Sequence, residues 1–123
     1  MVCGAQPDDK EFTDKEGLMK NIIPDHGYTK NSDQYIYFIR YITEMEPAFR
    51  NQFIKFLTGS KRLPIGGFKS LDPKMTFVKQ DLSSQEPDSS LPSVMACLNY
   101  VKSPGYSSYE VFKMKYDYSV ENG

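Results

Sequence analysis

The stretch that decides the fold runs from Leu91 to Pro104 and reads Leu-Pro-Ser-Val-Met-Ala-Cys-Leu-Asn-Tyr-Val-Lys-Ser-Pro. It is a mostly apolar run with a proline near each end. Val94, Tyr100 and Val101 favour extended backbone. Because the run is too short and too interrupted for a helix, it predicts a strand or a strand–turn–strand unit.

A break is expected in the middle of this stretch. Asn99 follows Cys97 by two residues, and asparagine is disfavoured inside a strand but common in turns. A tight turn at this point would lift the Cys97 thiol out of the sheet.

The composition indicates one folded domain. The chain has 123 residues, of which 14% are aromatic and 25% charged, and its formal net charge is −1. This length supports a single core. The balance is neither that of a disordered chain nor that of a nucleic-acid-binding protein.

The sequence also predicts where the protein resides. No apolar run approaches the roughly 20 residues that span a bilayer, and the first residues lack the basic and apolar regions of a signal peptide. Two cysteines alone form neither a disulfide framework nor a zinc site. We therefore expect an intracellular protein, cytoplasmic or nuclear, with free thiols and no membrane partner.

The first third of the chain predicts a short helix. Residues 1–12 are expected to be an entry segment, whose abrupt beginning suggests a fragment. Thr13-Asp14-Lys15-Glu16 matches a capping box. Leu18 and Ile22 follow as apolar positions of a helix that we expect to stop near Pro24.

Two amphipathic helices are expected next. Ser32 or Asn31 is a suitable N-cap, and apolar residues follow at helical spacing up to Met45. Pro47 fits the first turn of the following helix, and Gly59 is the expected C-terminal stop. Helices joined this tightly should form an angled or antiparallel pair.

After residue 59 the pattern changes to strands. Leu63–Phe68 predicts a short strand or turn, and Met75–Val78 predicts a strand. Asp81–Ser90 is polar and predicts a mobile loop. Ser107–Glu110 matches a second capping box, which opens a helix through about Val120. The fold class is therefore α+β, a small sheet packed with helices.

Cys97 is the main candidate for chemistry. The pattern by itself favours a buried small hydrophobic residue, as free cysteine often is. Papain-like catalysis needs a histidine beside the cysteine, and the sole histidine, His26, is distant in sequence. A cysteine without a resident histidine suits exchange between thioesters, since the leaving group is another thiol.

Other candidate sites are weaker. Cys3 is interpreted as structural or incidental, and His26 as a loop residue hydrogen-bonded to backbone. We expect no metal and no cofactor, because no cluster of ligands has metal-binding spacing. Gly66–Ser70 lacks the phosphate-loop frame. The basic middle of the chain predicts a solvated face, although a partner surface is the alternative.

Several motifs together resemble one family. Phe53–Ser60, Arg62–Phe68, Leu91–Asn99 and Pro104–Ser108, in this order and approximate spacing, resemble the C-terminal lobe of HECT-type ubiquitin-protein ligases. Asp25–Thr29 and Leu91–Met95 look closest to the ubiquitin-fusion-degradation subgroup. The resemblance covers essentially the whole chain.

The resemblance implies a domain organisation. Residues 1–6 would be the end of the N-terminal lobe and the interlobe hinge, with Gly4, Ala5 and Gln6 at the hinge itself. Residues 7–123 would be the C-terminal lobe. The resemblance also implies that the N-terminal lobe and the short C-terminal tail of the family are missing here, so that the isolated lobe would show little full-ligase activity.

The resemblance also implies a mechanism. The family's cysteine falls on Cys97, which would accept ubiquitin as a thioester from a ubiquitin-conjugating enzyme and pass it to a substrate lysine. The partners would be ubiquitin, the conjugating enzyme through the N-terminal lobe, and protein substrates. The supporting residues would be Leu91, Pro92, Ala96, Leu98 and Asn99.

Two departures from the family pattern bear on activity. Many members have threonine before the cysteine, where this chain has Ala96, and histidine two residues before it, where this chain has Met95. The missing threonine hydroxyl removes a possible hydrogen bond near the thiolate or the developing oxyanion. We expect slower transfer rather than its loss. The alternative is a catalytically degenerate lobe that binds ubiquitin or another protein without chemistry.

Overall fold

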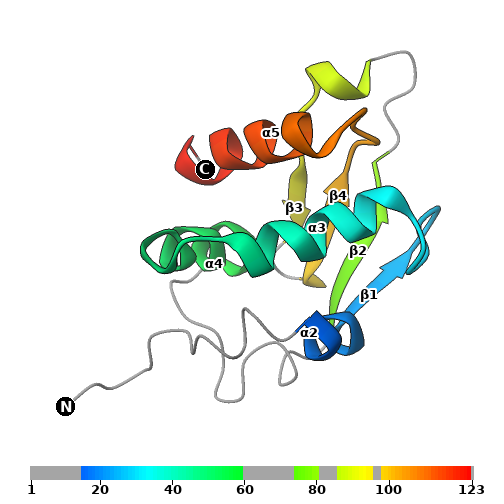
Figure 1. Ribbon diagram of the computed structural model, residues 1–123, viewed down its shortest axis with the longest axis horizontal. Helices are drawn as coiled ribbons and strands as arrows, with labels where there is room; N and C mark the ends of the chain where they lie inside the picture. Colours follow the sequence, from blue (N-terminus) through cyan, green and yellow to red (C-terminus); the bar gives the residue numbers. More distant parts are fainter. Residues whose placement is uncertain (1–14, 60–73, 81–85, 96–97, 123) are drawn as a thin grey trace.

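The structure is a computed structural model that describes residues 15–59, 74–80, 86–95 and 98–122. Most of the helices come before most of the strands in the chain, and a long helix follows the last strand (Figure 1). The elements are α2 (Lys15–Asn21), β1 (Ile22–Asp25), α3 (Asp33–Glu44), the 3-10 turn η1 (Pro47–Phe49), α4 (Arg50–Thr58), β2 (Met75–Lys79), the 3-10 turn η3 (Pro87–Ser89), β3 (Ser93–Met95), β4 (Tyr100–Ser103) and α5 (Tyr109–Asn122).

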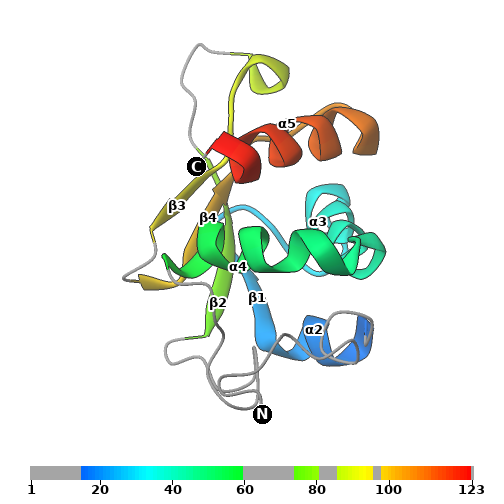
Figure 2. The ribbon, with the colours of Figure 1, turned by 90° about the vertical axis from the view of Figure 1, so that its left-hand side faces the viewer.

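The described strands form one mixed sheet in the order β1-β2-β4-β3. β1, β2 and β4 are parallel, and β3 runs antiparallel to β4. The helices α3, α4 and α5 lie together on one side of this sheet (Figure 2). The α+β prediction, a small sheet packed with helices, is therefore confirmed.

The core lies between the sheet and the helices. On α3, the buried residues Tyr35, Phe38 and Ile42 follow helical spacing and face the sheet. The Phe38 ring stacks on the ring of Phe77 from β2, with centroids 4.6 Å apart. Tyr116 from α5 completes this aromatic layer at 5.9 Å from Phe38. Aromatic pairs at such spacings stabilise a core beyond the area they bury.

The helix ends follow the sequence signals closely. Pro47 begins η1, which continues into α4. Gly59 caps α4 in the left-handed conformation, with φ of 76°, which is the conformation that glycine adopts without strain. Ser32 occupies the N-cap position of α3 as predicted, but its hydroxyl accepts the backbone N–H of Thr29 at 2.8 Å instead of a helix N–H.

The prediction that the first helix continues to near Pro24 is wrong. α2 stops at Asn21, and Ile22–Asp25 forms the strand β1 instead. Among the described strands β1 pairs only with β2, so it is one of the two edge strands of the sheet. Proline is tolerated on an edge because its missing N–H breaks no ladder bond there. Ile22 is fully buried and belongs to the core of the sheet.

The cap of α5 differs by one residue from the prediction. Ser108, not Ser107, is the N-cap, since its hydroxyl accepts the N–H of Val111 at 3.3 Å. Ser107 instead binds Asp88 of η3. Within the predicted mobile loop Asp81–Ser90, residues 87–89 form η3, which is attached to the beginning of α5, while residues 81–85 lie outside the described part. The predicted strand or turn at Leu63–Phe68 and Thr13 of the first capping box lie outside it too.

Candidate active site

The stretch quoted first forms two strands joined by a turn. β3 and β4 pair antiparallel, with Val94 opposite Val101 and Met95 opposite Tyr100. Val101 is fully buried and Val94 packs partly against the core. These inward valines fix the register, because a slip by one residue would expose them. The strand–turn–strand prediction is confirmed.

Asn99 marks the turn. Its φ is 54°, the left-handed conformation that asparagine tolerates better than most residues. The carbonyl oxygen of Asn99 accepts the backbone N–H of Thr76 at 2.8 Å. The turn is thus attached to the beginning of β2, at the edge of the sheet where β2 and β4 start (Figure 1). The predicted break in the strand near Asn99 is confirmed.

The supporting residues that the resemblance named differ in exposure. Leu91, which precedes β3, and Leu98, in the turn, are 40% and 44% exposed. Pro92 between them in sequence is buried. The exposed leucines before β3 and in the turn offer apolar contact area to a partner.

Cys97 and Ala96 lie outside the described residues, as do Gly4, Ala5 and Gln6, which were expected at the interlobe hinge. The expectation that a turn lifts the Cys97 thiol out of the sheet therefore stays a prediction. The described residues that flank the pair are Met95 at the end of β3 and Leu98 in the turn.

His26 lies in the turn after β1. Its backbone N–H donates to Oδ1 of Asp25 at 2.8 Å, and its carbonyl oxygen accepts the N–H of Lys79 at 3.3 Å. Its ring lies 6.5 Å from the ring of Tyr100, between centroids. The side chain is 64% exposed. This placement agrees with the interpretation of His26 as a hydrogen-bonded loop residue.

Hydrogen bonds that the sequence pattern does not predict fix the segment that precedes β3. Asp88 accepts two hydrogen bonds from Ser107, from its backbone N–H at 2.9 Å and from its hydroxyl at 2.6 Å. These bonds lower the pKa of the Asp88 carboxyl below its usual range. The Tyr106 hydroxyl also donates to the carbonyl oxygen of Ser90 at 2.7 Å. The segment before Leu91 is therefore attached to the beginning of α5.

The C-terminal end of β4 is bound by a residue from the turn after β1. The Tyr28 hydroxyl donates to the carbonyl oxygen of Ser103 at 2.9 Å. Burial raises the pKa of Tyr28 to about 12, so the phenol stays protonated and a donor. The hairpin is thus anchored at both ends of β4.

Two further properties concern the described ranges only. Within them, no three His, Cys, Asp or Glu side chains gather closely enough to hold a metal ion. Among the helices described, none has the length and apolar character needed to cross a membrane.

The fold and this hairpin agree with the family that the sequence matches. The model of the HECT-domain (ubiquitin-transferase) family matches residues 1–123. The chain therefore belongs to this family of ubiquitin transferases.

Particular relatives narrow the comparison. The chain is 41% identical over 116 residues, or 94% of its length, to the E3 ubiquitin-protein ligase TRIP12 of Danio rerio. It is 39% identical over its whole length to the E3 ubiquitin-protein ligase UPL4 of Arabidopsis thaliana. It is 43% identical over 86% of its length to the ubiquitin fusion degradation protein 4 of Saccharomyces cerevisiae. It spans only 6–8% of the length of these relatives.

Proposed function

We propose that Cys97 accepts ubiquitin as a thioester from a ubiquitin-conjugating enzyme and transfers it to a lysine of a protein substrate. The observation that carries this proposal is the left-handed turn at Asn99, two residues after the position of the family cysteine. We expect a cysteine just before such a turn to lie outside the sheet ladder, which suits a nucleophile that two large partners must reach in succession.

The chemistry needs two exchanges at one sulfur. The Cys97 thiolate attacks the carbonyl carbon of the thioester at the ubiquitin C-terminus, and the thiolate of the conjugating enzyme leaves. The uncharged ε-amine of a substrate lysine then attacks the new thioester. An isopeptide bond forms, the Cys97 thiolate leaves, and the amine proton passes to solvent or to a nearby base. This is covalent catalysis that divides one transfer into two steps.

The described surroundings support this sequence of events. Exchange between thiols of similar acidity needs little base catalysis. The exposed Leu98 lies in the turn, one residue after the position of Cys97, and can cover the reacting thioester against water while ubiquitin is bound. An intracellular location follows for a protein that works through a free thiol.

The test uses a longer protein that contains this chain and the N-terminal lobe of the family. It is incubated with activating enzyme, conjugating enzyme and ubiquitin, and adducts are separated with and without reductant. The expected result is a reductant-sensitive ubiquitin adduct that Cys97→Ala abolishes. Cys3→Ala, which removes the other cysteine, should leave the adduct intact. Cys97→Ser should give an adduct that resists reductant, because an oxyester replaces the thioester.

The alternative has a distinct outcome. A folded protein that binds ubiquitin but forms no adduct through Cys97 would identify a degenerate binding lobe. The departure at Ala96 is tested by Ala96→Thr, for which we expect faster thioester formation. An unchanged rate would show that the threonine hydroxyl of other members is not needed here.

A further inference from the structure

A pocket on the helical side of the protein lies apart from the hairpin. Its volume is about 260 Å³, and its lining comes from the end of α3, from η1 and the residues before it, and from α5. Pockets for drug-sized ligands have about 300–1,000 Å³. The pocket therefore suits one long side chain better than a cofactor.

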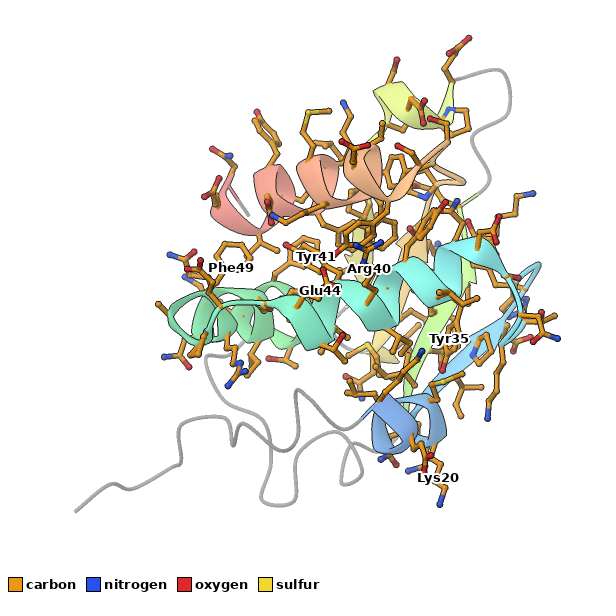
Figure 3. The ribbon with its side chains drawn as sticks, viewed as in Figure 1. Lys20, Tyr35, Arg40, Tyr41, Glu44 and Phe49 are labelled. Atoms are coloured by element: carbon orange, nitrogen blue, oxygen red, sulfur yellow. The ribbon has the colours of Figure 1, made fainter. Side chains whose placement is uncertain are left out.

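The inner part of the pocket is apolar and aromatic. Tyr41 and Met45 of the α3 end are buried, and Phe49 and Tyr109 are partly buried around them. Figure 3 shows Tyr41 and Phe49 in the space between α5 and the helices below it. Such a lining packs well against the methylene stem of a long side chain, and aromatic rings attract a cation.

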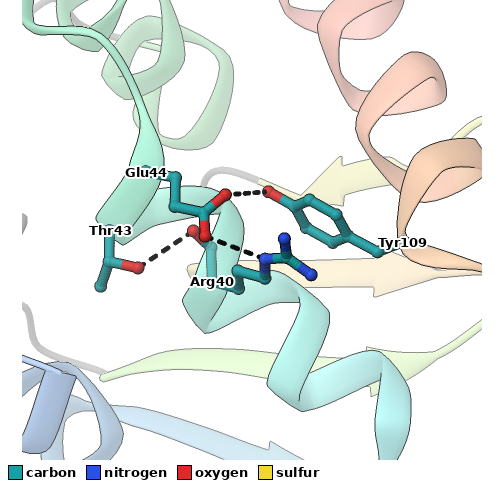
Figure 4. Close-up of polar contacts among 4 residues, drawn as sticks. All are labelled: Arg40, Thr43, Glu44 and Tyr109. Carbon is teal, nitrogen blue, oxygen red and sulfur yellow. Dashed lines mark hydrogen bonds and ion pairs between the residues drawn. The ribbon is translucent and has the colours of Figure 1, made fainter.

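Two acidic groups of the wall are held in place by the protein. The Glu44 carboxylate accepts a hydrogen bond from Nε of Arg40 at 2.9 Å and another from the Tyr109 hydroxyl at 3.5 Å (Figure 4). The Arg40 guanidinium also lies 4.1 Å from the centre of the Tyr109 ring. The Asp117 carboxylate accepts the Tyr41 hydroxyl at 2.6 Å and Nζ of Lys113 at 2.8 Å. These contacts fix the wall and balance the charge of both carboxylates.

Two further carboxylates leave the pocket negative. Glu46 and Glu121 are exposed and line the pocket. Neither carboxylate has a hydrogen-bond or ion-pair partner within the part of the chain that the structure describes. With Glu44 and Asp117 balanced by Arg40 and Lys113, the formal charge that remains at the pocket is that of Glu46 and Glu121.

We propose that this pocket binds the side chain of a basic residue, arginine or lysine, presented by a protein partner. The stem enters between Phe49 and Tyr109, and the cationic end lies between Glu46 and Glu121. A cation favours this site over a neutral residue of equal length because the two carboxylates attract it at short range. The site is a specificity surface of the helical layer, independent of the thioester chemistry proposed for Cys97.

The experiment measures binding of a small probe to the 123-residue chain by NMR. The probe is Nα-acetyl-arginine amide, and Nα-acetyl-norleucine amide, whose side chain keeps an unbranched apolar stem without the charge, is the neutral comparison. We expect arginine to shift the backbone resonances of Glu46, Phe49 and Glu121, and norleucine to shift them far less. The arginine effect should weaken as salt rises.

Two double variants distinguish binding at this pocket from a nonspecific effect of the negative charge of the chain. Glu46→Gln with Glu121→Gln should weaken arginine binding about fivefold, the size expected when two exposed ion pairs are lost. Glu16→Gln with Glu86→Gln removes the same charge elsewhere and should leave binding within about twofold. Thermal unfolding of both variants checks the fold. No detectable binding, equal binding of norleucine, or equal loss in both variants would overturn the proposal.

Discussion

The backbone N–H of Thr76 donates a hydrogen bond to the carbonyl oxygen of Asn99 across 2.8 Å. This bond joins the start of β2 to the turn that follows the position of Cys97. It links two residues that are 23 positions apart in the sequence. The conformation of Asn99 therefore bears on both the stability of the sheet and the placement of the turn.

Asn99→Ala tests that conformation. The φ of Asn99 is 54°, and a left-handed residue with a β-carbon costs about 1–2 kcal/mol unless its side chain compensates. We expect Asn99→Ala to lower the free energy of unfolding by about 1 kcal/mol. Asn99→Gly, which adopts this conformation freely, should cost less. Denaturant unfolding measures both, and an equal loss in the two variants would show that the side chain and not the backbone matters.

Asp88 should contribute stability that depends on pH. Its pKa is lowered by the hydrogen bonds from Ser107, so its contribution is present above the ordinary carboxyl pKa and is lost as pH falls through the lower folded value. We expect Asp88→Asn to be less stable than the native chain at neutral pH, with a difference that vanishes in acid. Glu86→Gln, at the N-cap of the same turn, is the control. Thermal unfolding from neutral to acid pH decides the matter, and a difference that persists in acid contradicts it.

The Tyr41 hydroxyl should stabilise the contact between α3 and α5. It is buried and donates to Asp117 at 2.6 Å, and hydrogen bonds to charged groups contribute about 1.5–3 kcal/mol. Since Asp117 is partly exposed, we expect Tyr41→Phe to cost about 1–2 kcal/mol. Tyr118→Phe, at an exposed position of α5, should cause no measurable loss of stability. Similar losses in both variants would exclude the hydrogen bond as the cause.

Alkaline pH should unfold the protein through tyrosines that are buried or half-buried. Burial raises the pKa of Tyr28, Tyr35 and Tyr109 to about 12, from an ordinary value of 10.0. The folded state then binds more protons than the unfolded state between these values, so stability is complete below pH 10 and falls as pH rises through 12. Ultraviolet titration of the phenols should show ionisation together with unfolding. Ionisation of Tyr28, Tyr35 and Tyr109 near pH 10 while the chain stays folded would contradict this.

The core predicts a larger effect from a single ring. Phe38 is fully buried and stacks on Phe77. Removing a buried aromatic side chain costs about 3–5 kcal/mol, so we expect Phe38→Ala to leave little folded protein at room temperature. Ile36→Ala, two residues away on the same helix and 43% exposed, is the matched control. Circular dichroism separates the two outcomes, and a folded Phe38→Ala would show that the core adapts.

The sequence by itself determined the elements whose signals are local. The apolar spacing of α3, the glycine at the end of α4, the strand β2 and the break at Asn99 all follow from the backbone preferences of nearby residues. The family followed from several motifs in one order. Ile22–Asp25 was misassigned because the helical spacing before it continues through Ile22, and a proline there also suits a helix end.

The tertiary structure alone decided the contacts between distant segments. Neither the parallel pairing of β1 with β2 nor the bond between Asp88 and Ser107 has a sequence pattern, because each depends on how the whole chain folds back on itself. The pocket between α3 and α5 is of the same kind: its carboxylates come from separate elements. Local preferences fix the elements, but packing of the shared core fixes which of their polar groups meet.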